Sequence, residues 1–266
     1  TLNRNSPGLI NAVFAEKYFY DLRADKLANQ MEHVVANHQE FNTDFPEIIE
    51  KLEKKGPYVE EFAAAFPKFE ERAINKHSIT ASMAAYVSSL TGLNSEFDQY
   101  VRNETDQLSK AAYDGFNIFM GKGTCGTCHF APVFNGLVPP LYDESESEVL
   151  GVATAPGDSG AVVLDPDYGR IASKRLTDES WVYERSFKTV TVRNVALTAP
   201  YMHNGAYPDL ESVIEFYNRG GGVGHGLEVP NQTLPPDPLN LTDYEKKALI
   251  AFMNALTDNT AATADY

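Results

Sequence analysis

The stretch Phe119-Met-Gly-Lys-Gly-Thr-Cys-Gly-Thr-Cys-His129 contains both cysteines of this 266-residue chain. Cys125 and Cys128 are three positions apart, and His129 follows directly. Cys-x-x-Cys-His is the attachment signature of c-type haem. Cysteines at this spacing lie on one turn, so each can form a thioether with a haem vinyl group while the adjacent histidine reaches the iron. The stretch therefore predicts covalently attached haem c with His129 as proximal ligand.

Three other interpretations of the cysteine pair are weaker. A thioredoxin-like redox pair usually begins a helix after a strand, and no strand pattern precedes Cys125. A zinc site needs two further ligands at fixed spacing, and the sequence has no second cysteine pair. A structural disulfide does not require His129.

The ligand on the other side of the iron is open from the residues alone. The candidates downstream of the motif are Met202, His203, Tyr217 and His225. A methionine opposite histidine would make a high-potential electron-transfer centre. A tyrosine would supply a hard phenolate oxygen that favours ferric iron. Each of these residues, taken alone, is more often structural than a ligand.

Composition narrows the class of protein. Hydrophobic residues make up 43% of the chain, which predicts a packed core in one large domain or two small ones. The formal net charge of −15 argues against nucleic acid as a partner and suits a basic protein partner. No apolar run approaches the ~18 residues of a membrane-spanning helix.

Apolar residues at helical spacing predict a mainly α protein with long loops and little β structure. Asp209 is placed to cap one helix, and Thr242-Asp-Tyr-Glu245 is a capping box that begins the last helix. The Pro-, Gly- and Asp-rich stretch 130–185 predicts loops, with a solvated acidic cluster at 143–148 and a frayed tail at 261–266. The expected helices are 47–54, 58–66, 79–90, 96–101, 110–120, 210–218 and 243–256.

Three long stretches carry a family resemblance. They are the quoted motif, Phe187-Lys-Thr-Val-Thr-Val-Arg-Asn-Val-Ala-Leu-Thr-Ala-Pro-Tyr-Met-His-Asn-Gly205, and Leu210-Glu-Ser-Val-Ile-Glu-Phe-Tyr-Asn-Arg-Gly-Gly221. Arg4-Asn-Ser-Pro7 and Phe19-Tyr-Asp-Leu-Arg-Ala24 extend the match to the N-terminal part. Together they resemble the bacterial di-haem cytochrome c peroxidase and MauG family over essentially the whole chain.

The resemblance implies two cytochrome c-like helical lobes. Residues 1–92 would be the remainder of the first, peroxidatic haem lobe, residues 93–257 the second c-type haem domain, and residues 258–266 a tail. Family members carry one haem per lobe, whereas this sequence shows only the second attachment motif. We therefore expect a second haem from a segment or chain that precedes Thr1; the alternative is a lineage that has lost the first haem.

The resemblance also suggests the second axial ligand. In the family this ligand lies 17 residues after the proline that is Pro200 here, which is Tyr217. Electron-transfer peroxidases have methionine at this position, and MauG-type proteins have tyrosine. This chain is thus similar to the MauG branch. The alternative is that Tyr217 only packs on its helix while Met202 ligates.

Two residues match the family's peroxide site, and a third departs from the family pattern at the relay position. Gln30 and Glu40 are ten positions apart, like the family's distal acid–base pair, and a carboxylate can shuttle a proton between peroxide oxygens. Tyr20 stands where the family usually has a tryptophan relay between the haems. A tyrosine radical is coupled to proton loss, so the relay would be altered.

Asn5, Thr198 and Pro200 match a calcium site between the lobes. Calcium takes side-chain amide and backbone carbonyl oxygens as ligands, usually completed by water. The resemblance implies that this ion ties the two lobes together.

The resemblance implies a periplasmic oxidoreductase that uses hydrogen peroxide, with the His129/Tyr217 haem storing or relaying oxidising equivalents. The electron donor would be a small cytochrome c or cupredoxin, or the reductant would be a side chain of a protein substrate, which the Tyr ligand favours. The sequence leaves room for a homodimer. Two alternatives are a mono-haem electron-transfer cytochrome without peroxidase activity and a haem-based sensor.

Overall fold

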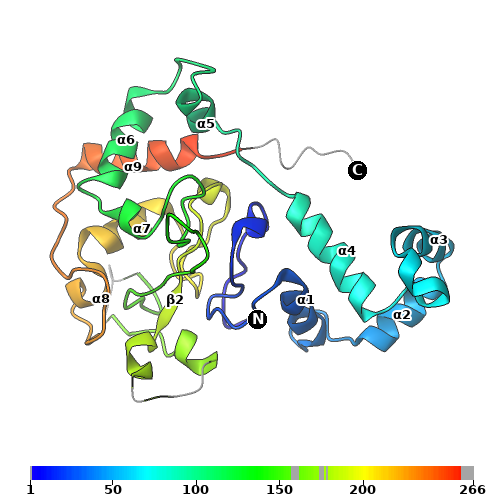
Figure 1. The fold of residues 1–266 in the computed structure, drawn as a ribbon. Coiled ribbons are helices and arrows are strands. Elements are labelled where there is room, and N and C mark those ends of the chain that lie inside the picture. Colours follow the sequence, from blue (N-terminus) through cyan, green and yellow to red (C-terminus); the bar gives the residue numbers. More distant parts are fainter. Residues whose placement is uncertain (1, 157–161, 174–176, 178, 259–266) are drawn as a thin grey trace.

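This computed structural model describes residues 2–156, 162–173, 177 and 179–258. Within these residues the chain is mainly helical, with one two-stranded antiparallel sheet (Figure 1), which confirms the expected fold class. The helices are α1 Leu27–Ala36, α2 Phe45–Glu53, α3 Gly56–Ala65, α4 Lys76–Ser89, α5 Glu96–Val101, α6 Lys110–Met120, α7 Leu210–Asn218, α8 Gly221–Gly224 and α9 Asp243–Ala255. The strands are β1 Ser147–Val149 and β2 Ser186–Lys188.

The two helices whose caps the sequence identifies, α7 and α9, begin where it predicts. The Asp209 side chain accepts a hydrogen bond from the Ser212 N–H at 2.8 Å, and Thr242 forms a capping box with Glu245. Helix α1 was not expected. Its N-cap residue is Lys26, which makes no side-chain cap, so the usual start signal is missing.

The N-terminal part packs around a small apolar cluster between α1 and α4. Its buried members are Tyr18, Ala24, Leu27, Met31 and Val87. Helices α2 and α3 contain no buried residue among the described side chains, and they project away from the rest of the molecule in Figure 1.

A larger core lies in the C-terminal part, where α6 packs on α9. Phe119, Phe134 and Phe252 meet edge to face at centroid distances of 5.2–5.9 Å. The two helices approach so closely at Gly115 that a Cβ there would lie 1.9 Å from the Ala248 carbonyl oxygen. This contact places the cysteine motif, directly after α6, against a rigid core.

The short sheet corrects the expectation of a solvated loop at 143–148. Asp143 and Glu144 are exposed, but Glu146 and Glu148 are only partly exposed, and β1 pairs with β2 so that Glu148 lies opposite Phe187. Pairing to β2 supplies the hydrogen bonds that a loop would take from water.

Asp258, the first residue of the expected tail, is buried. Its side chain accepts a hydrogen bond from the Asn94 N–H at 2.7 Å, and its own N–H donates to Asn194 Oδ1 at 2.7 Å. Residues 259–266, which include the tail predicted at 261–266, lie outside the described residues. No helix in the described part of the chain is long and apolar enough to cross a membrane.

Candidate haem site

Cys125 begins a short 3-10 turn, Cys125–Thr127, which residues 121–124 separate from the end of α6, and Cys128 is the C-cap residue of this turn. Both thiols are free, and Cys125 Sγ lies 3.3 Å from the Gly123 carbonyl oxygen. Burial raises the pKa of Cys125 to about 12 and that of Cys128 to about 11. The turn thus presents two reduced thiols, as thioether attachment requires.

His129 is held by the loop that follows it. Its Nδ1 lies 3.2 Å from the carbonyl oxygen of Phe134. Burial lowers the pKa of His129, and hydrogen bonds with the backbone of Phe134 and Val190 oppose that shift. A neutral imidazole that donates from Nδ1 presents the lone pair of Nε2, which is the form that binds a metal.

Tyr217 lies near the end of α7 and is brought close to the cysteines by the fold. Burial raises the pKa of its phenol far above the usual range, and electrostatic interaction with the neighbouring Cys125, Cys128 and Glu148 raises it further. Its ring packs edge to face on Phe216 at a centroid distance of 5.6 Å. The Tyr217 phenol is therefore close enough to both cysteine thiols to interact with them electrostatically.

The other candidate axial ligands have different surroundings. Met202 packs, like Tyr217, against the cluster of Val152, Tyr207 and Phe216. His203 stacks on Phe187 at 3.5 Å between ring centroids, and its Nε2 lies 3.5 Å from Asp165 Oδ1. His225 stacks on Phe216 at 5.6 Å.

The donor set fits haem c. Two uncharged thiols on one turn suit thioether formation, and the neutral imidazole and the phenol suit iron. The four groups come from residues 125–129 and from α7, which are far apart in sequence.

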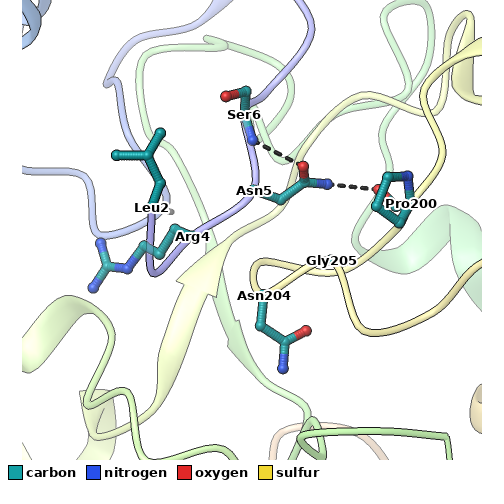
Figure 2. Close-up of a pocket in the computed structure, with 7 residues that line it drawn as sticks. All are labelled: Leu2, Arg4, Asn5, Ser6, Pro200, Asn204 and Gly205. Atoms are coloured by element: carbon teal, nitrogen blue, oxygen red, sulfur yellow. Dashed lines mark hydrogen bonds between the residues drawn. The ribbon is translucent and has the colours of Figure 1, made fainter. Parts of the chain in front are cut away.

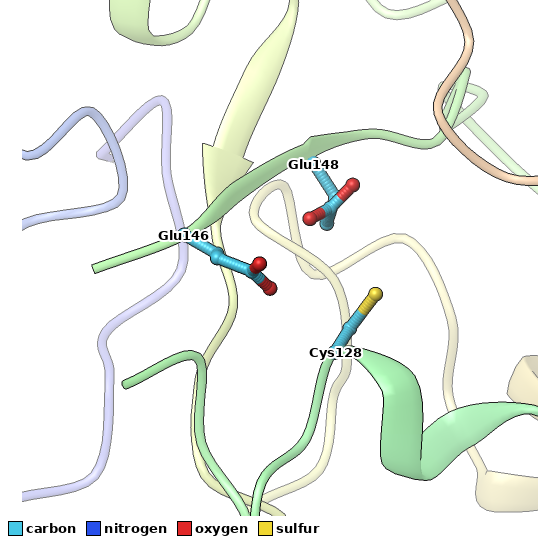
Figure 3. A group of neighbouring side chains, drawn as sticks. All are labelled: Cys128, Glu146 and Glu148. Carbon is cyan, nitrogen blue, oxygen red and sulfur yellow. The ribbon is translucent and has the colours of Figure 1, made fainter. Parts of the chain in front are cut away.

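Glu148 on β1 and Glu146, the residue before this strand, lie close to Cys128 (Figure 3), and sequence reasoning missed them. The sulfur and one oxygen of each carboxylate lie within 4.8 Å of one another. Burial, followed by the charge of Glu148, raises the pKa of Glu146. The available signal was the two-residue spacing of these glutamates, because side chains two apart on a strand share a face.

Gln30, Glu40 and Tyr20 differ in their surroundings. Gln30 is partly buried on α1, whereas Glu40 is exposed beyond the end of that helix and accepts a hydrogen bond from Asn37 Nδ2 at 2.7 Å. Within the described residues no hydrogen bond joins Gln30 to Glu40. Burial raises the pKa of Tyr20 to about 12.

The residues expected to bind calcium meet at the surface between the N-terminal segment and the 198–205 turn. Asn5 Nδ2 lies 2.6 Å from the Pro200 carbonyl oxygen, and Asn5 Oδ1 accepts from the Ser6 N–H at 3.0 Å (Figure 2). Thr198 lies beside this segment, since a Cβ on Gly8 would be 3.9 Å from its methyl carbon. They line or adjoin a cavity of about 280 Å³ that Leu2, Arg4, Asn204 and Gly205 also line.

The candidate calcium site offers oxygen atoms, which are the ligands that calcium prefers. The Pro200 carbonyl and the Asn5 amide oxygen are both hard oxygen donors. An amide's nitrogen and oxygen exchange places when the group is turned over, so Asn5 can present its oxygen to the cavity.

An ion-pair network at the same junction was also missed. Arg4 binds Asp167 at 2.6 and 2.8 Å and Asp21 at 2.7 Å. Single arginines and aspartates carry no signal of their pairing in a sequence, so only the fold could reveal this contact.

Comparison with known proteins shows the family of the chain. A family model described as di-haem cytochrome c peroxidase matches residues 1–106. Cytochrome-c peroxidase IdrP2 of Denitromonas iodatirespirans is 31% identical, over 96% of this chain and 68% of the relative. Methylamine utilization protein MauG of Methylorubrum extorquens is 26% identical, over 98% of this chain and 66% of the relative.

Solved structures share the fold. A MauG-like protein associated with microbial copper homeostasis superposes with a TM-score of 0.80 at 24% identity, covering 99% of this chain and 78% of that one. The di-haem peroxidase BthA of Burkholderia thailandensis gives a TM-score of 0.72 at 20% identity, covering 97% and 72%.

The helical fold and the Cys125–His129 motif define a c-type haem protein. The chain belongs to the di-haem cytochrome c peroxidase and MauG family, and is a peroxidase-type oxidoreductase.

Proposed function

We propose that this protein is a periplasmic peroxidase of the MauG branch whose second haem c is attached to Cys125 and Cys128 and has His129 and Tyr217 as axial ligands. The observation that carries the proposal is the Tyr217 side chain, which is partly buried against Tyr207 and Phe216 and whose pKa is raised by burial and by the neighbouring Cys125 and Cys128. It uses hydrogen peroxide to oxidise an electron donor or a protein substrate.

Haem c, when bound, supplies an iron centre that takes up and stores oxidising equivalents. His129 offers Nε2 while its Nδ1–H stays on the Phe134 carbonyl. Tyr217 would hold the iron through its phenolate oxygen, and an anionic oxygen donor favours higher oxidation states of iron. The buried surroundings that raise the pKa of the free phenol mean that only a bound cation makes loss of the phenol proton favourable.

In the first lobe, which we propose to be residues 1–92, Gln30 and Glu40 serve peroxide activation. Glu40 holds and returns a proton at its carboxylate, and Gln30 orients the pair. The hydrogen bond from Asn37 to Glu40 and the placement of Gln30 on α1 support this assignment. Because the family carries two haems, the proposal includes a second haem c held by a segment outside residues 1–266.

Tyr20 relays electrons between this lobe and the second, which we propose to be residues 93–257. Asn5, Thr198 and Pro200 hold calcium at the junction. The 2.6 Å contact between Asn5 and Pro200 supports this proposal.

The reductant is a small basic cytochrome or cupredoxin, or a side chain of a protein substrate. The net charge of −15 supports a basic partner, because complementary charge speeds association. Tyrosine ligation favours the protein substrate.

The experiment compares the ferric spectrum and electron paramagnetic resonance of Tyr217→Phe, Tyr217→Met and Met202→Leu with the unaltered protein. Tyr217→Phe should remove the phenolate signature, and Tyr217→Met should give a His/Met spectrum. Tyr207→Phe, which removes a neighbouring phenol from the same cluster, is the matched control. A spectrum changed by Met202→Leu but not by Tyr217→Phe would make Met202 the ligand and contradict the assignment.

The haem stoichiometry of the native protein and its turnover of peroxide test the proposed second haem and the proposed peroxidase activity. Two haems per functional unit and turnover of peroxide are expected. One haem without peroxide turnover would instead make this protein a mono-haem electron-transfer cytochrome.

A further inference from the structure

The segment Thr191–Val192–Arg193 makes hydrogen bonds with the loop that follows the cysteine motif. Arg193 Nε donates to the Pro132 carbonyl oxygen at 2.8 Å. Thr191 Oγ1 donates to the Val133 carbonyl oxygen at 2.6 Å, and the Arg193 N–H donates back to Thr191 Oγ1 at 3.1 Å. Two successive carbonyls of the loop are therefore held by one short segment.

The next carbonyl, that of Phe134, is the one that holds His129. It accepts the backbone N–H of Val192 at 3.0 Å and lies 3.2 Å from His129 Nδ1. The Arg193 guanidinium also lies 5.6 Å from the centroid of the Phe134 ring. The hydrogen bonds from residues 191–193 therefore extend to the Phe134 carbonyl oxygen, which is the acceptor that orients the His129 imidazole.

Arg193 is itself anchored to α5 through a buried ion pair. Its Nη1 and Nη2 donate to the two carboxylate oxygens of Asp98 at 2.8 and 2.7 Å. The side chains are 2% and 11% exposed, so water screens the pair little. Asp98 also accepts the N–H of Ser95 at 2.9 Å as part of the capping box of α5.

We infer that Arg193, fixed by Asp98, is a positioning residue that sets the strength and direction of the hydrogen bond between His129 Nδ1 and Phe134. The inference rests on the proposed role of His129 as axial ligand. A planar guanidinium makes two bonds to one carboxylate and a third to a carbonyl in fixed directions, which a lysine ammonium does not reproduce. Arg193 therefore fixes the position of the loop at Pro132 and Phe134 relative to α5. A stronger Nδ1 hydrogen bond makes the imidazole a better donor and lowers the reduction potential of its metal.

The test uses the full, haem-loaded protein and the double variant Arg193→Met with Asp98→Asn. Replacing Arg193 alone would leave a buried, unpaired carboxylate and endanger folding. Asn keeps an acceptor for the Ser95 N–H. Arg193→Lys is the conservative variant, and Arg102→Met is the control, because Arg102 makes the same two-bond contact with Glu104 at the surface.

Two quantities are measured: the hydrogen exchange rate of the His129 Nδ1 proton by nuclear magnetic resonance, and the midpoint potential of the haem. In the double variant we expect exchange about five-fold faster, as the weakening of one hydrogen bond predicts, and a more positive potential. Arg193→Lys should recover part of both changes, and Arg102→Met should change neither.

The variant His129→Ala distinguishes a failure of the proposed ligand set from a failure of the positioning role of Arg193. If it leaves the ligand spectrum unchanged, His129 is not the ligand, and the proposed ligand set and this inference both fall. If it changes the spectrum but the double variant behaves like Arg102→Met in both measurements, the ligand set stands and the positioning role of Arg193 is overturned.

Discussion

The backbone N–H of Lys188 on β2 donates to the carbonyl oxygen of Tyr20 across 2.7 Å. The side chain of the same lysine donates from Nζ to the Lys17 carbonyl oxygen at 2.6 Å and lies 5.5 Å from the centroid of the Tyr18 ring. One residue of the C-terminal part therefore holds both ends of the segment 17–20. The position of Tyr20 depends on this contact.

The ammonium group of Lys188 should make stability depend on pH. Burial lowers its pKa from 10.5 to about 8. Between these two values the unfolded chain binds more protons than the folded one, so stability rises as pH rises through this window. Relative to Lys188→Met, the unaltered protein should gain about 2 kcal/mol of unfolding free energy between pH 7.5 and 10. Urea unfolding at several pH values measures this.

Lys122→Met is the control for Lys188, because Lys122 pairs with Glu245 at the surface. Curves for the unaltered protein and Lys188→Met that run parallel from pH 7.5 to 10 would contradict a buried, destabilised ammonium.

The relay proposed for Tyr20 should be limited by its proton. A buried phenol with a pKa of about 12 keeps its proton at neutral pH, so its oxidation must also release that proton. Tyr20→Trp should speed electron transfer between the haems, and Tyr20→Phe should slow it by about ten-fold or more, a change of roughly 1.4 kcal/mol in the barrier. Stopped-flow absorption after peroxide addition gives the rates. Equal rates in Tyr20→Phe and the exposed control Tyr86→Phe would exclude Tyr20 from the route.

Removal of calcium should loosen the junction at Asn5. A chelator should lower the melting temperature of the unaltered protein, and Asn5→Ala should lower it without further response to the chelator. At a hundred-fold excess over its dissociation constant, calcium would contribute about 2.7 kcal/mol. Asn3→Ala, an exposed asparagine two positions away, is the control. A chelator effect of equal size in Asn5→Ala would place the ion elsewhere.

Gly115→Ala should destabilise the protein even though alanine favours helices. Helix propensity alone predicts a gain of about 1 kcal/mol. The added Cβ would lie 1.9 Å from the Ala248 carbonyl oxygen, so α6 and α9 must separate, at a net cost of about 1–3 kcal/mol. Gly56→Ala, where a Cβ meets nothing within 4 Å, serves as control. Thermal unfolding measures both, and a more stable Gly115→Ala would contradict the observed packing.

The parts of the fold that the sequence predicted correctly are those marked by interactions between residues close together in the chain. Asp209 and the Thr242 capping box mark helix starts because each side chain bonds to a backbone N–H three residues away. Helix α1 lacks such a cap and was missed. Glu146 and Glu148 were misread as solvated because only pairing with β2 reveals that the chain enters a strand at Ser147, which leaves both glutamates partly buried.

By itself the sequence determined the haem attachment motif, since two thiols and an imidazole within five residues share one turn whatever surrounds them. It also determined where α7 and α9 begin, because Asp209 and Thr242 each cap a backbone N–H three residues away. The tertiary structure alone decided that the Tyr217 phenol lies near those thiols, that Arg193 meets Asp98, and that Gly115 touches Ala248. These contacts join residues far apart in the chain, and only the packing of the core brings such residues together.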